Sequence, residues 1–83
     1  MLPGPQNFNY SPISQILTWD AVTGAEEYSI EYSQDPENDF VNLYMGANNY
    51  CPFQVPSGTY YLSGKTKSEG GWGKPGTTEM IVV

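Results

Sequence analysis

The sequence predicts an all-β protein, either a sandwich or a barrel of antiparallel strands. Short apolar-polar alternations recur about every 8–12 residues with turn residues between them, which is the spacing of consecutive strands in such folds. Seven Pro and nine Gly are spread along the 83 residues, and no uninterrupted segment repeats apolar positions at helical spacing. We therefore expect residues 1–83 to form one small domain with little or no helix.

Seven strands are predicted in chain order. In the second, Leu17 and Trp19 share one face because side chains alternate along a strand. The third is the clearest, since Tyr28, Ile30 and Tyr32 alternate with polar residues. The predicted ranges are 7–10, 15–19, 27–33, 40–44, 50–55, 59–67 and 77–83.

The fifth predicted strand is the least regular. Pro52 cannot donate a ladder hydrogen bond, so this strand is expected at an edge or at a bulge. Its alternation leaves two inward sets open, either Tyr50 or the group Cys51, Phe53 and Val55.

Five segments resemble a fibronectin type III domain, in that family's order and over nearly the whole chain. They resemble its opening Pro-x-Asn-Leu, its second strand with a buried Trp, its Tyr-x-Val-x-Tyr strand, the compact Leu-Pro-x-Gly-Thr-Tyr of bacterial and phage members, and its late Gly-x-Gly. The matching residues are Pro5-Gln6-Asn7-Phe8, Leu17-Thr18-Trp19, Tyr28-Ser29-Ile30-Glu31-Tyr32, Val55-Pro56-Ser57-Gly58-Thr59-Tyr60-Tyr61, and Gly71-Trp72-Gly73 followed by Pro75. The resemblance implies a seven-strand antiparallel β-sandwich of fibronectin type III or immunoglobulin-like type.

The same resemblance implies a tyrosine corner at Tyr60, whose hydroxyl would bond backbone near the preceding turn. The sequence departs from the family at Gly64 and Thr66, where Val and Ala are usual. The centre of that strand is therefore thin, and we expect Tyr50 or Tyr61 to fill the space. The expected structural core consists of Trp19, Tyr28, Ile30, Tyr32, Tyr60 and Leu62.

Charge and composition exclude several functions. Nine acids against three Lys and no Arg give a net charge of -6, which argues against nucleic acid and anionic membranes as partners. No run approaches the roughly 18 apolar residues of a spanning helix, so we predict no membrane insertion. The N-terminus has no signal-peptide pattern, so we expect the sequon Asn9-Tyr10-Ser11 to be unused. The two functions weighed below place the protein on a virion surface or outside the cell, which it would reach without a visible signal.

We predict a protein that is not an enzyme and binds no cofactor or metal. The sequence contains no His, which removes Ser-His-Asp and Cys-His arrangements. The single Cys51 excludes an intrachain disulfide and a multi-cysteine zinc site. We interpret it as a half-buried strand residue rather than a reactive or intermolecular thiol. A sandwich this small has little room for a cleft holding two carboxylates roughly 5–10 Å apart.

Two motifs have structural explanations that we favour over ligand binding. Residues 71–76 match Gly-x-Gly-x-x-Gly, but Pro75 blocks the helix that a dinucleotide site needs. The glycines are instead expected to permit positive φ angles in a hairpin loop. The carboxylates of residues 35–39 resemble the start of a calcium loop, but Phe40 and Gly46 occupy the positions of its essential Gly and Glu.

The region that we expect to contact a partner is the loop 67–76. It carries Trp72 and Lys74, and Trp and Tyr bury large areas at interfaces for a modest loss of entropy. Trp72 either packs against the sandwich edge or contacts a ligand directly. Tyr44 and Tyr61 are expected to face outward or to lie near an edge, with the same two alternatives.

The resemblance implies a non-enzymatic module, for which we weigh two functions. The preferred hypothesis is a complete small structural or decoration protein of a phage particle, attached to a capsid or tail surface by strand addition or by burial of Tyr and Trp. Its acidic surface would keep clustered copies soluble. The alternative is a spacer or weak carbohydrate-binding module from a larger secreted bacterial protein, with a coplanar row of aromatics and a cell-surface glycan as partner.

The charges are also separated along the sequence. Seven of the nine acids lie between Asp20 and Asp39, and the three Lys lie between Lys65 and Lys74. This separation predicts two differently charged surfaces, of which the one bearing Trp72 would meet the partner.

Overall fold

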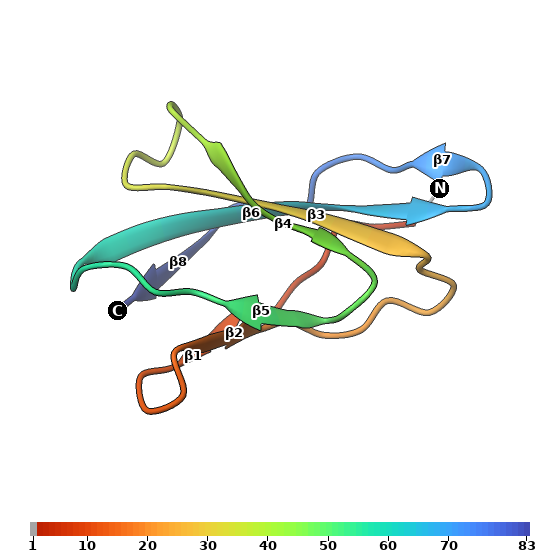
Figure 1. Ribbon diagram of the computed structural model, residues 1–83. Helices are drawn as coiled ribbons and strands as arrows, with labels where there is room; N and C mark the ends of the chain where they lie inside the picture. The colour runs from red at the N-terminus through yellow and green to blue at the C-terminus, as the bar shows by residue number, and fades with distance from the viewer. Residues whose placement is uncertain (1) are drawn as a thin grey trace.

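The computed structural model describes residues 2–83, which form two antiparallel sheets packed face to face (Figure 1). The smaller sheet has the order β1-β2-β5, and the larger sheet places β4, β3 and β6 side by side, with both β7 and β8 paired to β6. The strands are β1 (Asn9–Ser11), β2 (Ile16–Thr18), β3 (Glu27–Ser33), β4 (Val41–Gly46), β5 (Tyr50–Pro52), β6 (Thr59–Ser68), β7 (Gly71–Trp72) and β8 (Glu79–Val82). The predicted antiparallel β-sandwich is confirmed.

The described residues form eight strands rather than seven, because β7 lies within the predicted loop 67–76, and β8 corresponds to the last predicted strand, 77–83. β7 ends before Pro75, which has no N–H for a ladder bond. Gly73 and Gly76 still donate single backbone hydrogen bonds to β6, and regular strand pairing with β6 begins again at Glu79. The first strand begins at Asn9 rather than at Asn7, since Asn7 has a φ of 59° that interrupts the extended backbone.

The fifth strand ends at Pro52, three residues earlier than predicted. Tyr50 is 49% exposed, whereas Cys51 and Phe53 are 2% and 0% exposed. The side chains of Cys51 and Phe53 therefore face the core, which settles the alternative that the sequence left open.

The predicted core residues lie between the two sheets. Trp19 and Tyr28 meet edge to face with ring centroids 5.7 Å apart, and Phe53 contacts the rings of Tyr32 and Tyr60 in the same way at 5.2 and 5.5 Å. Tyr32 is only partly buried, at the margin of this cluster. The buried apolar side chains are Phe8, Leu17, Trp19, Tyr28, Ile30, Cys51, Phe53, Tyr60 and Leu62.

Tyr60 fixes the turn that precedes β6. Its ring is 3% exposed, and its hydroxyl donates a hydrogen bond of 2.7 Å to the carbonyl oxygen of Pro56. This is the tyrosine-corner contact that the family resemblance implies.

The thin centre of β6 is filled by the N-terminal segment and not by an aromatic ring. A Cβ on Gly64 would lie 2.8 Å from Ile30 Cδ1 and 3.0 Å from Pro5 Cδ, so these two side chains already occupy the space. Tyr50 is exposed, and Tyr61 alternates with the buried Tyr60 and therefore points to the outer face. The expectation that Tyr50 or Tyr61 fills this gap is wrong.

We predict that Gly64→Ala lowers the free energy of unfolding by about 1–3 kcal/mol, the usual cost of overpacking a core. The added methyl group would meet Ile30 and Pro5 at distances that require both to shift. The measurement is urea denaturation followed by tryptophan fluorescence.

Gly70→Ala is the matched control, because the nearest atom to a Cβ there is Ser68 Oγ at 3.9 Å. Its stability should stay within about 0.5 kcal/mol of the wild type, as for other surface changes. Equal stability of the two variants would contradict the packing described for Gly64.

Candidate functional site: the free edge of β8

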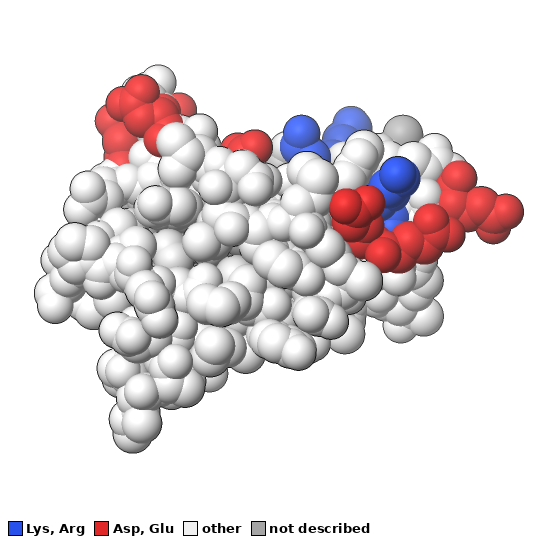
Figure 2. Space-filling model, viewed as in Figure 1, with Lys and Arg blue, Asp and Glu red and all other residues white. Residues whose placement is uncertain are grey.

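The separation of charges along the sequence does not produce one acidic and one basic surface. Glu27 and Lys67 are register partners on β3 and β6, and Glu27 Oε1 lies 4.0 Å from Lys67 Nζ. Figure 2 shows lysines and acids together at this end of the molecule, whereas the tip of the loop between β3 and β4 shows acids alone. Because β3 pairs with β6, acidic and basic side chains lie next to each other at this end. The prediction of two differently charged surfaces is wrong.

Trp72 lies on the outer face of the large sheet. It is 36% exposed and pairs with Lys67, whose Nζ is 5.9 Å from the centroid of the indole ring. That distance is within the range of cation–π attraction. The indole is thus partly covered by a lysine of its own chain.

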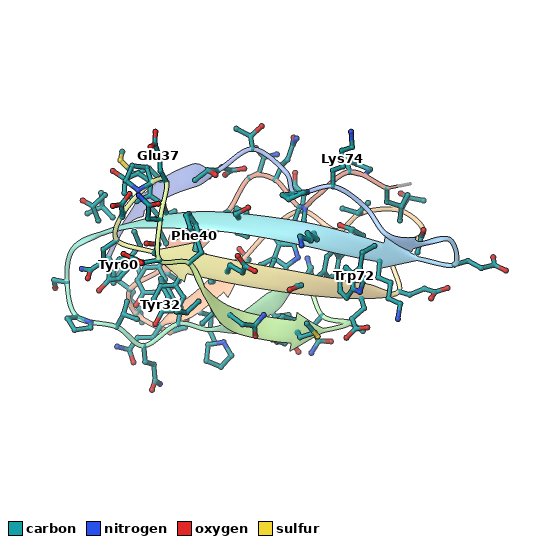
Figure 3. The ribbon with its side chains drawn as sticks, turned by 90° about the horizontal axis from the view of Figure 1, so that it is seen from above. Tyr32, Glu37, Phe40, Tyr60, Trp72 and Lys74 are labelled. Atoms are coloured by element: carbon teal, nitrogen blue, oxygen red, sulfur yellow. The ribbon has the colours of Figure 1, made fainter. Side chains whose placement is uncertain are left out.

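Lys74 does not share a site with Trp72. Figure 3 shows the two side chains pointing away from one another, on opposite sides of the chain that follows β7. Lys74 is exposed and borders a separate shallow hollow of about 460 Å³, whose other walls include Leu2, Pro3 and Pro75. The predicted contact residues of the loop 67–76 therefore do not converge on one surface.

Tyr44 lies on β4, an edge strand, but its ring faces inward. The register shift between Ile30 and Glu31 places Tyr44 opposite the buried Ile30, so it takes the inner face. Its ring centroid is 5.8 Å from that of Trp19, and its hydroxyl accepts a hydrogen bond of 3.0 Å from the backbone N–H of Asn48. Tyr44 therefore lies at an edge, as expected, but its ring does not face outward.

The glycines of residues 71–76 have two different roles. Gly71 has a φ of +106°, as expected for a hairpin. Gly73 and Gly76 instead let the N-terminal segment approach, since a Cβ on Gly73 would strike the carbonyl oxygen of Leu2 and one on Gly76 would lie 3.1 Å from that of Pro5. This close backbone packing gives the motif a structural explanation.

Residues 2–83 contain no cluster of three or more His, Cys, Asp or Glu that could hold a metal ion. In the same part of the chain there is no helix long and apolar enough to cross a membrane. In the predicted calcium-like segment, Asp35 Oδ1 accepts a hydrogen bond of 2.9 Å from the backbone N–H of Glu37. That contact is an Asx turn, which orders the loop without a cation.

Tyr61 belongs to an apolar surface that the sequence analysis missed. It is the register partner of Met80, and both alternate away from the core. Met80 and Val82 are 61% and 70% exposed. We call Tyr61, Met80 and Val82 the β8 edge patch. The sequence could have indicated this surface, because residues 80–83 are all apolar, and such a run leaves apolar side chains on both faces of the strand.

The backbone of β8 is paired on one side only. Gly58 and Val83 exchange backbone hydrogen bonds of 2.8 and 3.1 Å. In an antiparallel pair, the N–H and C=O groups of every second residue point to the same side, so those of Ile81 point toward β6. The N–H and C=O groups of Met80 and Val82 point to the opposite side, where the described residues supply no strand partner. β8 thus presents a free edge beside its apolar patch.

Glu79 links β8 to the segment that precedes β1. Its two carboxylate oxygens accept hydrogen bonds of 2.9 Å from the backbone N–H groups of Asn7 and Phe8. The contact ties β8 to the chain entering β1, although the two strands belong to different sheets.

The other sheet edges carry features that hinder pairing with another chain. β5 contains Pro52, β1 is followed directly by Pro12, β4 has the register shift between Ile30 and Glu31, and β7 is only two residues long. β8 contains no Pro, Lys or register shift, and its one charged side chain, Glu79, is engaged within the molecule. By this comparison β8 is the edge best suited to accept a partner strand.

Solved structures with the same architecture identify the class of fold. A Fn3-like protein from Clostridium thermocellum aligns with a TM-score of 0.74 at 17% identity, covering 95% of this chain and 90% of that one. A fibronectin type III domain of human KIAA0970 protein aligns with a TM-score of 0.71 at 15% identity, covering 96% of this chain and 70% of that one. FN3tt aligns with a TM-score of 0.69 at 18% identity, covering 99% and 95%. The chain has the fibronectin type III fold.

No protein-family model matches the sequence, and none of the curated proteins matches it.

Cys51 should be unreactive in the folded protein. Burial raises the pKa of its thiol from 9.0 to about 11, so at pH 8 about one thiol in a thousand would be ionised even if reagent could reach it.

We expect labelling by an aromatic disulfide reagent at pH 8 to be at least a hundredfold slower in buffer than in urea. The unfolded thiol ionises at lower pH than the folded one, so this group favours unfolding as the pH rises from about 9 to 11. Fast labelling in buffer would contradict its burial.

Proposed function

We propose that this protein is a non-enzymatic interaction module that attaches to a larger protein assembly by adding β8 to a strand of a partner. The observation that carries the proposal is the unpaired edge of β8 beside the exposed side chains of Met80 and Val82. In strand addition, backbone hydrogen bonds supply affinity and alternate side chains supply specificity. The edge offers both, since backbone groups at residues 80 and 82 are free and their side chains are apolar.

A different protein suits this edge better than a second copy of the chain. Two copies each carry a net charge of -6, and like charge disfavours self-association. β8 is four residues long, so β8–β8 pairing alone would bury far less than the roughly 1,200–2,000 Å² of a stable interface. The partner is therefore expected to contact Tyr61 on the outer face in addition to pairing with β8.

The assembly that we propose is a phage particle, with the protein as a structural or decoration subunit on its surface. Support comes from the acidity of the chain, because repulsion between copies keeps them apart on a repeating surface.

The carbohydrate-binding alternative has less support. Trp72 pairs with Lys67, six residues along β6 from Tyr61, so the two outer-face aromatics lie about 20 Å apart with polar residues between them.

The test is co-sedimentation of recombinant protein with particles purified from the organism that encodes the chain. Met80→Lys should weaken retention at least tenfold, because it places an amine where about 1.5–3 kcal/mol of apolar burial is expected. Retention is measured as the bound fraction over a range of protein concentrations.

Met45→Lys is the matched control. Met45 is 57% exposed on β4, the opposite edge strand, and the substitution makes the same change in charge. It should leave retention unchanged. Equal retention of the two variants would rule out attachment through β8, and recovery of the wild-type chain only as free protein would rule out the particle.

A further inference from the structure

A surface hollow lies at the end of the sandwich opposite Trp72 (Figure 3). It measures about 530 Å³ and opens between the loop that follows β3 and the segment that precedes β6. Figure 3 shows Tyr32, Phe40 and Tyr60 together near this end, with Glu37 on the adjoining loop, and Trp72 and Lys74 at the other. The lining residues used below are Tyr32, Asp35, Asp39, Val41, Val55 and Tyr60.

The inner wall of the hollow is apolar and aromatic. The rings of Tyr32 and Tyr60 lie with centroids 6.1 Å apart at an angle of 53°. Tyr32 is partly exposed, so one ring is presented to solvent at this wall. Val41 and Val55 flank the rings. A flat or aliphatic group entering the hollow would contact this wall.

The rim of the hollow is acidic and ordered. Asp35 and Asp39 both line it. Ser33 Oγ donates a hydrogen bond of 2.6 Å to the carbonyl oxygen of Asn38 and accepts one of 2.9 Å from the backbone N–H of Asp35. These bonds hold the loop in shape before any ligand arrives, which lowers the entropy cost of binding.

Asp39 has an unusual backbone conformation at this rim. Its φ is 63°, in the left-handed region that residues other than Gly rarely adopt, although Asp and Asn tolerate it best. A Gly would satisfy the backbone at this position but would provide no carboxylate.

We propose that this hollow binds an arginine side chain on an exposed segment of a partner protein. A guanidinium is planar, stacks on aromatic rings and pairs with carboxylates, so it matches both the tyrosine wall and the acidic rim. No lysine lines the hollow, so neither carboxylate is neutralised from within it. The site is separate from the β8 edge patch and does not depend on strand addition.

The test is a nuclear magnetic resonance titration of the ¹⁵N-labelled protein with the blocked tripeptide Gly-Arg-Gly. Saturable shifts are expected for amides of residues 33–39 and 55–60, and they should weaken as salt is added. The same peptide with citrulline in place of arginine keeps the planar shape but lacks the charge, and it has a carbonyl oxygen in place of one NH2 group. It should cause less than one fifth of the shifts.

Two variants assign the effect to the rim. Asp35→Asn keeps an oxygen that can accept the bond from Glu37, and Asp39→Asn retains a residue type that tolerates the left-handed region. The double variant should weaken arginine-peptide binding about fivefold or more, while Glu69→Gln, in the distant β6–β7 turn, should leave it unchanged. Equal shifts with both peptides, no shifts with the arginine peptide, or equal affinity of the double variant and wild type would overturn the proposal.

Discussion

The packing of Pro5 on Gly64 determines how the two ends of the sequence meet. Because Gly64 has no Cβ, the N-terminal segment lies directly on the middle of β6. Gly4 lies against the backbone N–H of Gly76 and the carbonyl oxygen of Gly64, which are hydrogen-bonded to each other. A side chain on Gly4 would clash with both groups. The chain leaves this contact toward the small sheet, and Glu79 binds two backbone amides at the entry to β1. One small residue in the longest strand therefore fixes the path that links the sheets.

That path also explains why β8 has a free edge. The N-terminal segment accompanies residues 73–76, where the last strand is interrupted, and then crosses to the other sheet. Beyond Glu79, β8 continues along β6, and residues 2–83 place no strand on its other side. The exposed apolar side chains of Met80 and Val82 are thus next to unpaired backbone. The proposed attachment to a larger assembly follows from this geometry.

The sequence predicted the sandwich well because its strands alternate strongly. The range 27–33 of β3 and the inward positions of Leu17 and Tyr60 follow from the two-residue period alone. The filling of the space at Gly64 could not be predicted, since it depends on Pro5, 59 residues away in sequence. Neither could the mixing of charges, which results from the pairing of β3 with β6.

The candidate site was only partly visible in the sequence. Tyr61 was expected to face outward or to lie near an edge, but the free edge beside it depends on the path of the N-terminal segment, which no local pattern reveals. The inward turn of Tyr44 likewise depends on the register shift between β3 and β4. Periodicity indicates which faces are apolar, whereas the partner of each edge is a property of the assembled sheet.

The availability of the β8 edge is the central claim, and amide hydrogen exchange of the free protein tests it most directly. The N–H of Ile81 should be protected by β6, and that of Val83 by its hydrogen bond to the carbonyl oxygen of Gly58, the residue before β6. The N–H of Met80 and that of Val82 should exchange at least tenfold faster, because they have no backbone partner. Equal protection of all four amides would mean that this edge is already covered and would contradict the account.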